Sequence, residues 1–528
     1  MLSELVHQTL GGLLHQQTER FPDNDALVSD NARYTYSGLL EASGDLARRL
    51  LSAGVKRGTH VGVWSNDTPE MIVLLFAVWR LGAVALPMCT NYGPSELRYI
   101  IDMGGIEYIV IDSGYRELSF PELCRNLARP EQSCIFAMNH VENSGYLRLC
   151  DLPDAGAEAL AAAEKQVECT DSDTILFTSG STGKFKPVET SHFARVNTVI
   201  AQANAVEATE ADRFCSVLPL YHCFSISAVV LAAIASGASA CFPASRGTRD
   251  ILSFIEKHRC TVLTAVPTLF SALLKRQGEM KADLSSLRTG IIGGSSYPPA
   301  LFKRICDELG YDLLPSLGQT EATAGVTAGS LSDSLEVRST TLGVPFSGVE
   351  MRIDTKNGEP QGKDNPGEIC IRGFNVMKGY FRQEDATAQV IDPEGWLHTG
   401  DMGWMDEEGR LHYSGRIKEI IIRGGDNIFP GELERVILDD HRISECRAIG
   451  VPDPHYIEEI CVCVVVKPDQ NVTEDDIRQL VANRLSHSKI PRYVLFFDAL
   501  PRTATGKTDN MTLKAEANRL LGLDLKTQ

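Results

Sequence analysis

Apolar residues recur at helical spacing over much of the chain, and short continuous apolar runs separate these helical segments. The pattern predicts helices at 39–51, 69–81 and 95–103, with strands at 60–64, 83–87 and 108–111. The same order of strand and helix returns at 195–244 and at 248–293. Because strands that alternate with helices form mostly parallel sheets covered by helices, the sequence predicts an α/β fold with two doubly wound βα subdomains.

The pattern changes in the stretch from about residue 340 to residue 415. Short alternating runs at 349–353, 367–372 and 411–414 are separated there by Gly, Asp and Pro. Alternation over so few residues is typical of half-buried antiparallel strands. The sequence therefore predicts a distorted β-barrel after the two βα subdomains.

After Arg416 the alternation of strands and helices returns in a shorter unit. We therefore predict a large N-terminal domain at 1–415, a hinge at 416–418 and a small, mobile α+β domain at 419–528. At 528 residues, the chain is long enough for several structural units.

The composition is acidic, with 51 basic and 69 acidic residues and a formal net charge of −18. Such a charge argues against nucleic acid or anionic membrane as a general partner, and at first against anionic substrates too. The 14 cysteines form no CxxC pair, which favours buried thiols in a reducing compartment.

The N-terminal stretch 1–14 has no signal-peptide pattern. The apolar stretches 71–88 and 225–242 are interrupted by Arg80 and by several serines, so we expect a buried helix plus a strand in each rather than a membrane span. Together these patterns predict a cytoplasmic protein without an integral membrane segment, and they leave a homo-oligomer open.

A loop rich in glycine and hydroxyl groups follows an apolar run at 174–177. It reads Thr-Ser-Gly-Ser-Thr-Gly at 178–183, followed by Lys184 and Lys186. Glycines let backbone N–H groups point outward, and hydroxyls and lysines add donors and charge, which suits a polyphosphate. A plain surface turn is the alternative for this composition alone. The GxxxxGK[ST], GxGxxG, HExxH and GxSxG motifs are absent.

Further motifs follow in a fixed order along the chain. They are PLYHCFS at 219–225, GGSSYP at 293–298, LGQTE at 317–321, WLHTGD at 396–401, SGRIKEIIIRGGDNIFPGELE at 414–434 and PRTATGKTDN at 501–510. With the loop at 177–188, they resemble the adenylate-forming (ANL superfamily) AMP-dependent acyl-CoA synthetases, of medium-chain fatty-acid type. The resemblance runs from about residue 10 to 520. Phe185, Pro187 and Leu317 depart from the family's usual proline, glycine and aromatic residue.

The resemblance implies a role for each motif. Lys507 is implied as the catalytic lysine, Glu321 as the Mg²⁺ ligand, Thr320 as a contact to the α-phosphate, and His222 as a neighbour of the acyl carboxylate. Asp401 and Arg416 are implied to hold the ribose. The full set of implied ATP and AMP contacts is Thr178, Ser179, Gly180, Ser181, Thr182, Gly183, Lys186, Gly294, Ser295, Ser296, Leu317, Gly318, Gln319, Asp401 and Arg416.

The resemblance also implies a two-step reaction that uses ATP, CoA and Mg²⁺. An acid is activated as its acyl-AMP with release of pyrophosphate, and the acyl group then passes to CoA with release of AMP. Lys418 is implied as the residue about which the small domain turns between the steps. Gly424 and Gly425 are implied to line the path of the CoA arm. ATP and CoA would then meet a few placed cationic groups, despite the acidic charge of the whole chain.

The segments expected to line the acyl pocket are apolar or small. Their residues are Phe224, Val229, Val230, Tyr297, Leu317, Ala322 and Ala324. This lining predicts a medium-chain fatty acid as the substrate, with an aryl acid as the alternative. Three other functions stay open: an adenylation enzyme that loads a carrier protein, a luciferase-like oxidase, and an inactive relative that serves as a binding protein.

Overall fold

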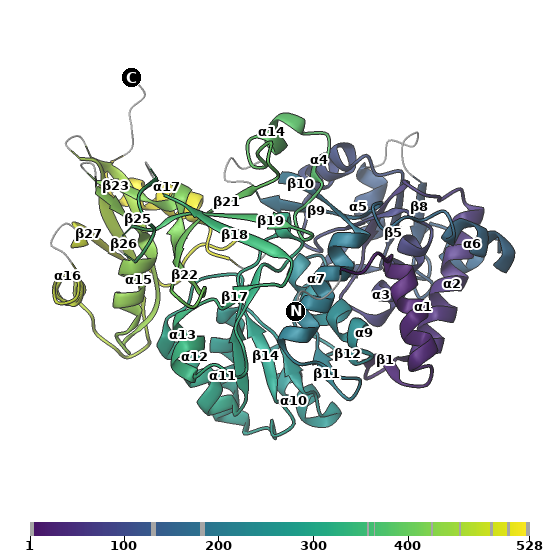
Figure 1. Ribbon diagram of the computed structural model, residues 1–528, viewed down its shortest axis with the longest axis horizontal. Helices are drawn as coiled ribbons and strands as arrows, with labels where there is room; N and C mark the ends of the chain where they lie inside the picture. The colour runs from purple at the N-terminus through teal and green to yellow at the C-terminus, as the bar shows by residue number, and fades with distance from the viewer. Residues whose placement is uncertain are drawn as a thin grey trace.

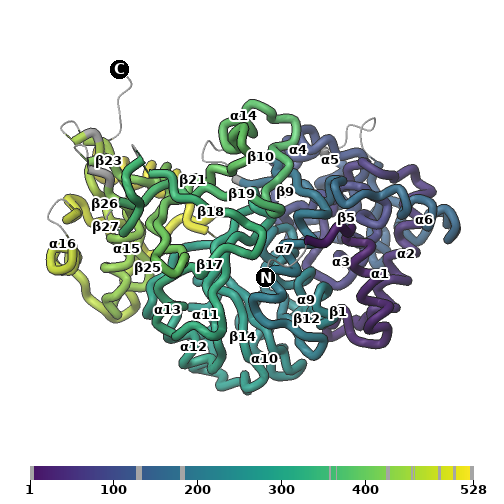
Figure 2. Tube along the Cα trace, in the orientation of Figure 1, coloured from purple at the N-terminus to yellow at the C-terminus, as the bar shows by residue number. Residues whose placement is uncertain are grey.

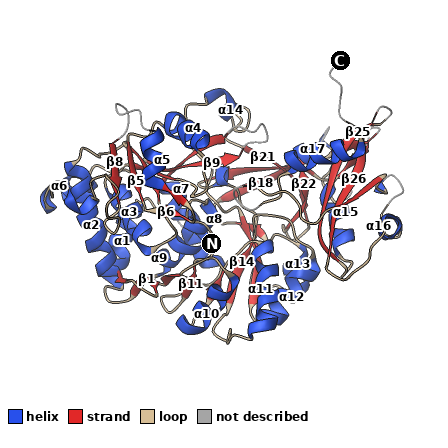
Figure 3. Cartoon of the chain, turned by 180° about the vertical axis from the view of Figure 1, so that it is seen from behind, coloured by secondary structure: helices blue, strands red, loops and turns tan. Residues whose placement is uncertain are grey.

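The computed structural model describes residues 5–127, 134–179, 185–355, 358–363, 365–423, 426–453, 456–485, 489–503 and 507–523. A large N-terminal part carries two seven-stranded sheets, and a smaller C-terminal part lies beside it at the yellow-green end of the colour range (Figure 1). Helices flank the sheets on their faces (Figure 3). The predicted α/β fold with a large N-terminal and a small C-terminal domain is confirmed.

The first seven-stranded sheet is parallel except for β2 at its edge. Its spatial order is β15 (Asp312–Pro315), β14 (Thr289–Ile292), β13 (Val262–Leu263), β11 (Arg213–Cys215), β12 (Ser239–Phe242), β1 (Asp25–Ser29) and β2 (Arg33–Thr35). Helices α10 (Thr248–His258), α11 (Pro267–Met280), α12 (Pro299–Leu309) and α13 (Leu335–Thr340) lie in a row along it. The strands are short and apolar because both faces of a parallel sheet are buried.

The second seven-stranded sheet is parallel from β9 to β8, whereas β10 and β20 are antiparallel. Its order is β20 (Gly379–Tyr380), β10 (Phe185–Ser191), β9 (Ser172–Ser179), β4 (Val84–Pro87), β3 (His60–Trp64), β5 (Tyr108–Ile111) and β8 (Cys134–Ala137). The hairpin of β6 (Gly114–Tyr115) and β7 (Leu118–Ser119) follows β5.

Several helices pack between or around these sheets: α1 (Leu10–Arg20), α2 (Tyr36–Ser52), α3 (Pro69–Arg80), α4 (Pro94–Gly104), α5 (Phe120–Leu127), α6 (Ala157–Glu164) and α7 (His192–Ala205). Helix α3 contacts strands of both sheets, and its residues are buried on every side. The helices predicted at 39–51, 69–81 and 95–103 correspond to α2, α3 and α4, so these predictions are confirmed.

A continuous helical segment follows His222. It consists of α8 (Cys223–Ser225), the six-residue π-helix η2 (Ile226–Leu231) and α9 (Ala232–Ser236). Segments of π-helix are rare and occur often at functional sites. The stretch 225–242 is thus a buried helix followed by β12, as predicted. Within the described ranges, no helix is long and apolar enough to cross a membrane.

The barrel-like region is a four-stranded antiparallel sheet made of β18 (Val349–Asp354), β19 (Gly367–Gly373), β21 (Leu397–Met405) and β22 (Leu411–Arg416). The short pair β16 (Thr327–Ala328) and β17 (Val344–Pro345) precedes it, and α14 (Glu384–Ala388) lies between β20 and β21 along the chain. Alternate residues of these strands, such as Ile369 and Ile371, enter an apolar core that the sheet shares with β20.

The C-terminal part contains one further sheet of β24 (Asp426–Ile428), β23 (Ile421–Arg423), β26 (Ile457–Val466), β25 (Ile443–Asp453) and β27 (Tyr493–Phe496). Helices α15 (Pro430–Leu438) and α16 (Glu474–Ala482) cover one face with one core, and α17 (Asn510–Leu521) covers the other with a second core. The two parts of the chain meet where β22 packs against α15. Figure 2 shows the yellow-green C-terminal part beside the rest of the chain. The predicted hinge lies between the end of β22 and the start of β23.

Candidate active site

The candidate site begins at the carboxyl end of the first sheet. The turn after β14 carries Gly294, Ser295 and Ser296, and the segment after β15 carries Leu317, Gly318 and Gln319. A Cβ atom placed on Gly293 would lie 3.2 Å from the carbonyl oxygen of Ser316, so the two segments are neighbours. Ligands of open α/β sheets bind at this edge, where loops leave the carboxyl ends of the strands. The structure therefore brings these two predicted segments together.

Gly318 is required by a close backbone approach. A Cβ atom at this position would lie 1.7 Å from the carbonyl oxygen of Ala324. Thr323 and Ala324 have φ angles of 51° and 87°, in the left-handed region that side chains other than glycine rarely adopt. The Thr323 hydroxyl donates to the carbonyl of Asn375 at 2.7 Å and fixes this turn. This turn therefore fixes the positions of Thr320 and Glu321, which directly precede it.

Thr320 and Glu321 form the 3₁₀ turn η3 (Thr320–Ala322). The Thr320 hydroxyl lies 3.4 Å from the Cys223 thiol, next to His222. Glu321 accepts a hydrogen bond of 2.9 Å from the Tyr380 hydroxyl. Burial and the nearby Glu321 carboxylate raise the pKa of Tyr380, so the phenol stays protonated and continues to donate.

Tyr380 also connects Glu321 to the predicted phosphate loop. It lies on β20, opposite Val188 of β10, and the Lys186 ammonium stands 4.5 Å from the centre of its ring. A cation above an aromatic face is attracted by the negative charge of that face. The sequence did not predict Tyr380 as a site residue. It belongs to none of the motifs named above, and it reaches Glu321 and Lys186 only through the pairing of β20 with β10.

The rest of the phosphate loop lies largely outside the described residues. Thr178 is opposite Lys186 in the pairing of β9 with β10, and β9 ends at Ser179. Gly180, Ser181, Thr182, Gly183 and Lys184 fall outside the described ranges.

One of the two departures from the family motif in β10 has a local explanation. The Phe185 ring packs edge-on against Tyr92 with centroids 5.5 Å apart, and the Tyr99 hydroxyl donates to the Phe185 carbonyl at 2.9 Å. The Pro187 carbonyl accepts a hydrogen bond of 2.8 Å from the Phe381 N–H, as any residue here would, and nothing in the structure explains the proline itself. Phe185 thus anchors the far side of the loop in an aromatic cluster.

His222 caps the helical segment that begins at Cys223. Its Nδ1 accepts a hydrogen bond of 3.3 Å from the Phe224 N–H. Burial, together with the positive charge of Lys507, lowers the pKa of His222 to about 4. The ring is therefore neutral near pH 7. Since Nδ1 accepts, we assign the proton to Nε2, which makes that nitrogen a hydrogen-bond donor.

Asp401 and Arg416 are cross-strand partners on β21 and β22. The Arg416 Nε atom lies 3.0 Å from Asp401 Oδ1, and the Tyr413 hydroxyl lies 3.5 Å from the same oxygen. Burial raises the pKa of Asp401, which is only 2% exposed, while Arg416 acts in the opposite direction. The Asp401 charge in turn raises the pKa of Arg416, so the guanidinium stays charged.

Lys507 brings the C-terminal part of the chain into this site. Burial lowers the pKa of Lys507 and the neighbouring Arg416 charge lowers it further, whereas Cys223, Asp401 and Glu321 raise it. Lys507 as a residue is nevertheless exposed to solvent. Its charge interacts with Arg416, Asp401 and Glu321 and lowers the pKa of His222, so the predicted Lys507 lies near the other predicted site residues.

The predicted hinge is a 3₁₀ turn, η5 (Ile417–Glu419), which contains Lys418. Glu419 is tied into the C-terminal part. Its carboxylate lies 3.2 Å from Arg447 Nη2 and accepts a hydrogen bond of 2.9 Å from Asn510. Asn510 stands three residues after Lys507, so the hinge and the lysine segment share one polar network. Gly424 and Gly425 lie outside the described residues.

Comparison with protein families identifies both parts of the chain. The family model described as "AMP-binding enzyme" matches residues 14–381, and the model "AMP-binding enzyme C-terminal domain" matches residues 432–507. A protein of Bacillus subtilis (strain 168) named as an acyl-CoA synthetase, YngI, is 32% identical over 545 residues, and the match covers 99% of each chain. The mitochondrial medium-chain acyl-CoA ligase ACSF2 of Rattus norvegicus is 30% identical, over 99% of this chain and 89% of the rat protein.

A solved structure of the o-succinylbenzoate CoA synthetase of Bacillus subtilis, in complex with its acyl-adenylate intermediate, is similar over most of its length. It has a TM-score of 0.80 and 26% identity, and the match covers 97% of this chain and 99% of that one. Another structure of the same enzyme holds ATP and a magnesium ion. Its TM-score is also 0.80, with 25% identity, over 96% of this chain and 100% of the other.

Proposed function

The chain belongs to the AMP-binding enzyme family and is an acyl-CoA synthetase, and on this premise we propose that it joins a medium-chain fatty acid to CoA in two steps. A carboxylate oxygen of the acid attacks the α-phosphorus of ATP, and pyrophosphate leaves. The CoA sulfur then attacks the carbonyl carbon of the acyl-AMP, and AMP leaves with the electron pair of the broken C–O bond.

The grouping of Lys507 with His222, Glu321, Asp401 and Arg416 carries this proposal. In the first step two anions approach each other, the carboxylate and the α-phosphate. The Lys507 ammonium offers a positive charge where negative charge builds up, and fixed charges in a partly buried site stabilise a transition state strongly. Asp401 and Arg416 offer an acceptor and a donor to the ribose. Neutral His222, next to Cys223 and the Thr320 hydroxyl that Cys223 contacts, adds no charge to the acyl side.

Glu321 fits the part of a magnesium ligand. Mg²⁺ prefers carboxylate and phosphate oxygens. Tyr380 donates to Oε1 of this carboxylate, and within the described part of the chain no hydrogen bond is made to Oε2. When bound, the ion would neutralise charge on the phosphates. Tyr380 orients the carboxylate without itself contributing an acceptor.

The apolar character of the acyl-side residues supports a fatty acid. Val229 and Val230 lie in the buried π-helix, and Ala322 and Ala324 are buried small residues. Phe224 approaches Gly293, with its ring tip 3.6 Å from the Cβ position of that glycine. None of these residues offers a charge to a second carboxylate or to an amine. The medium-chain name of the ACSF2 relative supports the same substrate class.

An aryl acid is the second candidate substrate, because the solved relative acts on o-succinylbenzoate. One experiment separates the two classes. AMP release is measured with ATP, Mg²⁺ and CoA across saturated acids from C2 to C18 and across benzoates and cinnamates. We expect the highest kcat/KM for saturated acids of intermediate length. A maximum among the aryl acids would overturn the medium-chain assignment.

The same assay identifies the acceptor. Free CoA and a holo-carrier protein are compared at equal concentration with the preferred acid. We expect thioester formation with free CoA, and preference for the carrier would identify a loading enzyme instead. Pyrophosphate exchange that fails with every acid would favour an inactive relative. We also expect the enzyme in the cytoplasm, where ATP and CoA are available, and fractionation of cells tests this.

A further inference from the structure

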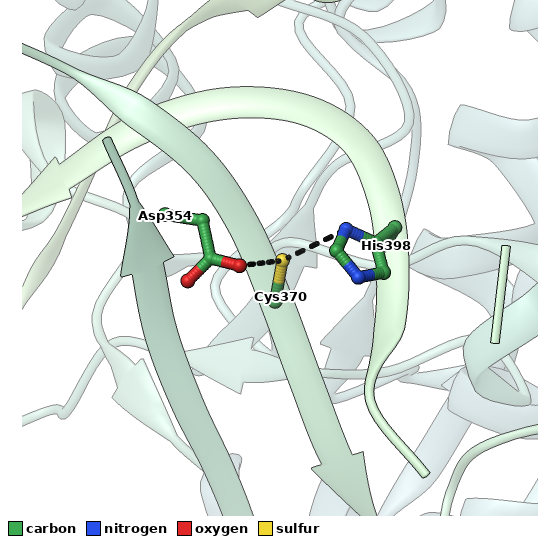
Figure 4. Close-up of side chains that lie close together, drawn as sticks. All are labelled: Asp354, Cys370 and His398. Atoms are coloured by element: carbon green, nitrogen blue, oxygen red, sulfur yellow. Dashed lines mark hydrogen bonds between the residues drawn. The ribbon is translucent and has the colours of Figure 1, made fainter. Parts of the chain in front are cut away.

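A cluster of three different ligand types lies in the four-stranded sheet, away from the site described above (Figure 4). Asp354 ends β18, Cys370 lies on β19, and His398 lies on β21. Cys370 is fully buried and is the direct cross-strand partner of His398. Its sulfur lies 3.4 Å from His398 Nδ1 and 3.5 Å from Asp354 Oδ2. The three ligand atoms all lie within 4.8 Å of one another.

A fourth donor lies next to His398. Glu368 precedes Cys370 by two residues and therefore lies on the same face of β19. Its Oε2 lies 3.0 Å from His398 Nδ1. The four donors come from three adjacent strands, so their positions are set by the pairing of the sheet rather than by a loop.

A second layer of polar groups surrounds these donors. Asp392 Oδ2 lies 3.6 Å from His398 Nε2, on the side of the ring opposite Cys370. Arg352 donates to Asp354 at 3.0 Å, and its guanidinium stacks over Trp396, 4.4 Å from the ring centroid. A carboxylate behind a metal-bound histidine orients the ring and makes it a better ligand. Asp392 stands in that position relative to His398.

We propose that Asp354, Cys370 and His398, with Glu368 as the fourth donor, form a binding site for one divalent transition-metal ion of the zinc type. Zinc takes Cys, His and carboxylate ligands at about 2.0–2.3 Å in a tetrahedron. Two ligands at these distances stand roughly 3.3–3.6 Å apart. The distances from the Cys370 sulfur to His398 Nδ1 and to Asp354 Oδ2, 3.4 and 3.5 Å, already match this separation between ligands.

The charges of the cluster also suit a dication. Asp354, Glu368 and Asp392 supply three carboxylates, and Arg352 supplies one positive charge. Binding of the ion displaces the proton of the Cys370 thiol, as thiolate ligands require. A thiolate and an imidazole favour zinc or cobalt over magnesium, so the Mg²⁺ that accompanies ATP does not compete.

Occupation of the site would tie β18, β19 and β21 together. Strand β21 also carries Asp401, three residues after His398. The second oxygen of Glu368 accepts a hydrogen bond of 3.0 Å from the N–H of Gly400, next to Asp401. An ion that binds only the folded chain stabilises it by mass action. The expected role is structural, to hold the strand that presents Asp401.

Cobalt is the probe that tests the proposal. The full-length protein is first treated with a chelator, then titrated with Co²⁺ in the presence of excess Mg²⁺, and its absorption spectrum is recorded. We expect one Co²⁺ per chain, visible bands of tetrahedral cobalt, and a near-ultraviolet charge-transfer band from a cobalt–thiolate bond. Zn²⁺ should abolish these bands and raise the melting temperature.

Variants assign the signal to the cluster. C370S should lose the charge-transfer band, and D392N should keep it with an affinity about 10–100-fold weaker. C134S removes an exposed thiol elsewhere and should change nothing. H412Q removes a half-buried histidine on β22 and should also change nothing.

The proposal is overturned by a charge-transfer band that persists in C370S, by a loss of the bands in excess Mg²⁺, or by the absence of a thiolate band in the native protein. If C370S does not fold, D392N still decides the matter, because it keeps every proposed ligand. An unchanged affinity of D392N for Co²⁺ would show that Asp392 does not support His398 as a ligand, and it would contradict the proposed site.

Discussion

The two halves of the active site are held in different ways. His222 precedes a helix, Glu321 lies in a 3₁₀ turn and Asp401 lies within β21, all in the large domain, and hydrogen bonds inside that domain hold each of them. Lys507 belongs to the small domain, and it reaches the same space only through the way that the two domains sit together. In the proposed function the large domain would supply constant nucleotide contacts, whereas the small domain would supply a charge that can be withdrawn. This difference would suit a reaction whose second step has no use for Lys507.

The largest expected effect comes from Lys507→Ala. Removal of the ammonium should slow formation of the acyl-AMP by about 100–1,000-fold, as for loss of a group that stabilises the transition state. Thioester formation from supplied acyl-AMP should stay near the native rate. Both half-reactions are measured separately, by pyrophosphate exchange and by consumption of acyl-AMP.

Lys514→Ala is the matched control for that variant, because Lys514 lies seven residues further on and pairs with Glu458 at 2.9 Å. It should leave both half-reactions unchanged. An equal loss of the two half-reactions in Lys507→Ala would show that both steps need the charge. That result would contradict the proposed difference between the large-domain and small-domain parts of the site.

Lys418→Pro should give the reverse pattern. Proline fixes φ near −65° and removes an N–H, so it restricts the torsions that a hinge must change. We expect thioester formation to fall by about 100-fold, the loss typical of misplaced reacting groups, while acyl-AMP still forms. Lys418→Ala is the control that removes the side chain alone. A native rate of thioester formation in Lys418→Pro would place the hinge elsewhere.

Asn510→Ala tests the network that connects the hinge to the lysine segment. Asn510 donates to Glu419 at 2.9 Å and accepts from Arg447 at 2.9 Å. The loss of hydrogen bonds to charged groups should lower the free energy of unfolding by about 1.5–3 kcal/mol. Denaturant unfolding measures it, with the exposed Asn483→Ala as the control. Equal unfolding curves for both variants would show that the network does not hold the small domain.

Tyr380→Phe tests the large-domain half of the site. Loss of the hydroxyl frees one oxygen of Glu321 and should reduce the rate of acyl-AMP formation by about tenfold. The Mg²⁺ concentration needed for half-maximal rate should rise as well. Tyr311→Phe removes a buried hydroxyl that donates to the Leu263 carbonyl and has no bond to Glu321, so it should leave both quantities unchanged. An unaltered Mg²⁺ dependence in Tyr380→Phe would remove Tyr380 from the site.

The smallest expected effect is that of pH on His222. Its pKa of about 4 lies below the ordinary value, so this imidazole gains its proton only in strong acid and is neutral throughout the range from pH 6 to pH 8. Between the unfolded pKa of about 6.5 and about 4, the unfolded chain binds a proton here that the folded chain does not, so stability falls as pH falls. The profile of kcat/KM against pH should therefore have no inflection near pH 6.5 that comes from His222. His222→Gln should leave this part of the profile unchanged. Such an inflection would mean that the ring is charged in the working site.

Motif order along the chain predicted Asp401 and Arg416 as members of one site, and the pairing of β21 with β22 brings them together; that they face a nucleotide stays a prediction. Both belong to short motifs, and their strands are neighbours, so local pattern and tertiary position agree. The roles of the loop at 180–183 and of Gly424 and Gly425 stay predictions. Sequence reasoning could not predict Tyr380, Arg447 or Cys370 as members of clusters, because their partners are distant in the chain. Phe185 shows the same limit, since its replacement of proline makes sense only beside Tyr92 and Tyr99.

The π-helical turn at Ile226–Leu231 has a consequence for engineering of the acyl specificity. A turn of π-helix holds about one more residue than a turn of α-helix, and each α-helical residue turns the chain by about 100°. Side chains before and after η2 therefore face directions that an uninterrupted α-helix would not give them. Removal of one residue within 226–231 would allow η2 to become an ordinary α-helical turn, with Cys223–Ser225 and Ala232–Ser236 kept on their present faces. A single deletion, rather than a substitution, is thus the smallest genetic change that could reshape the proposed acyl side at Val229 and Val230 without turning the helix on either side.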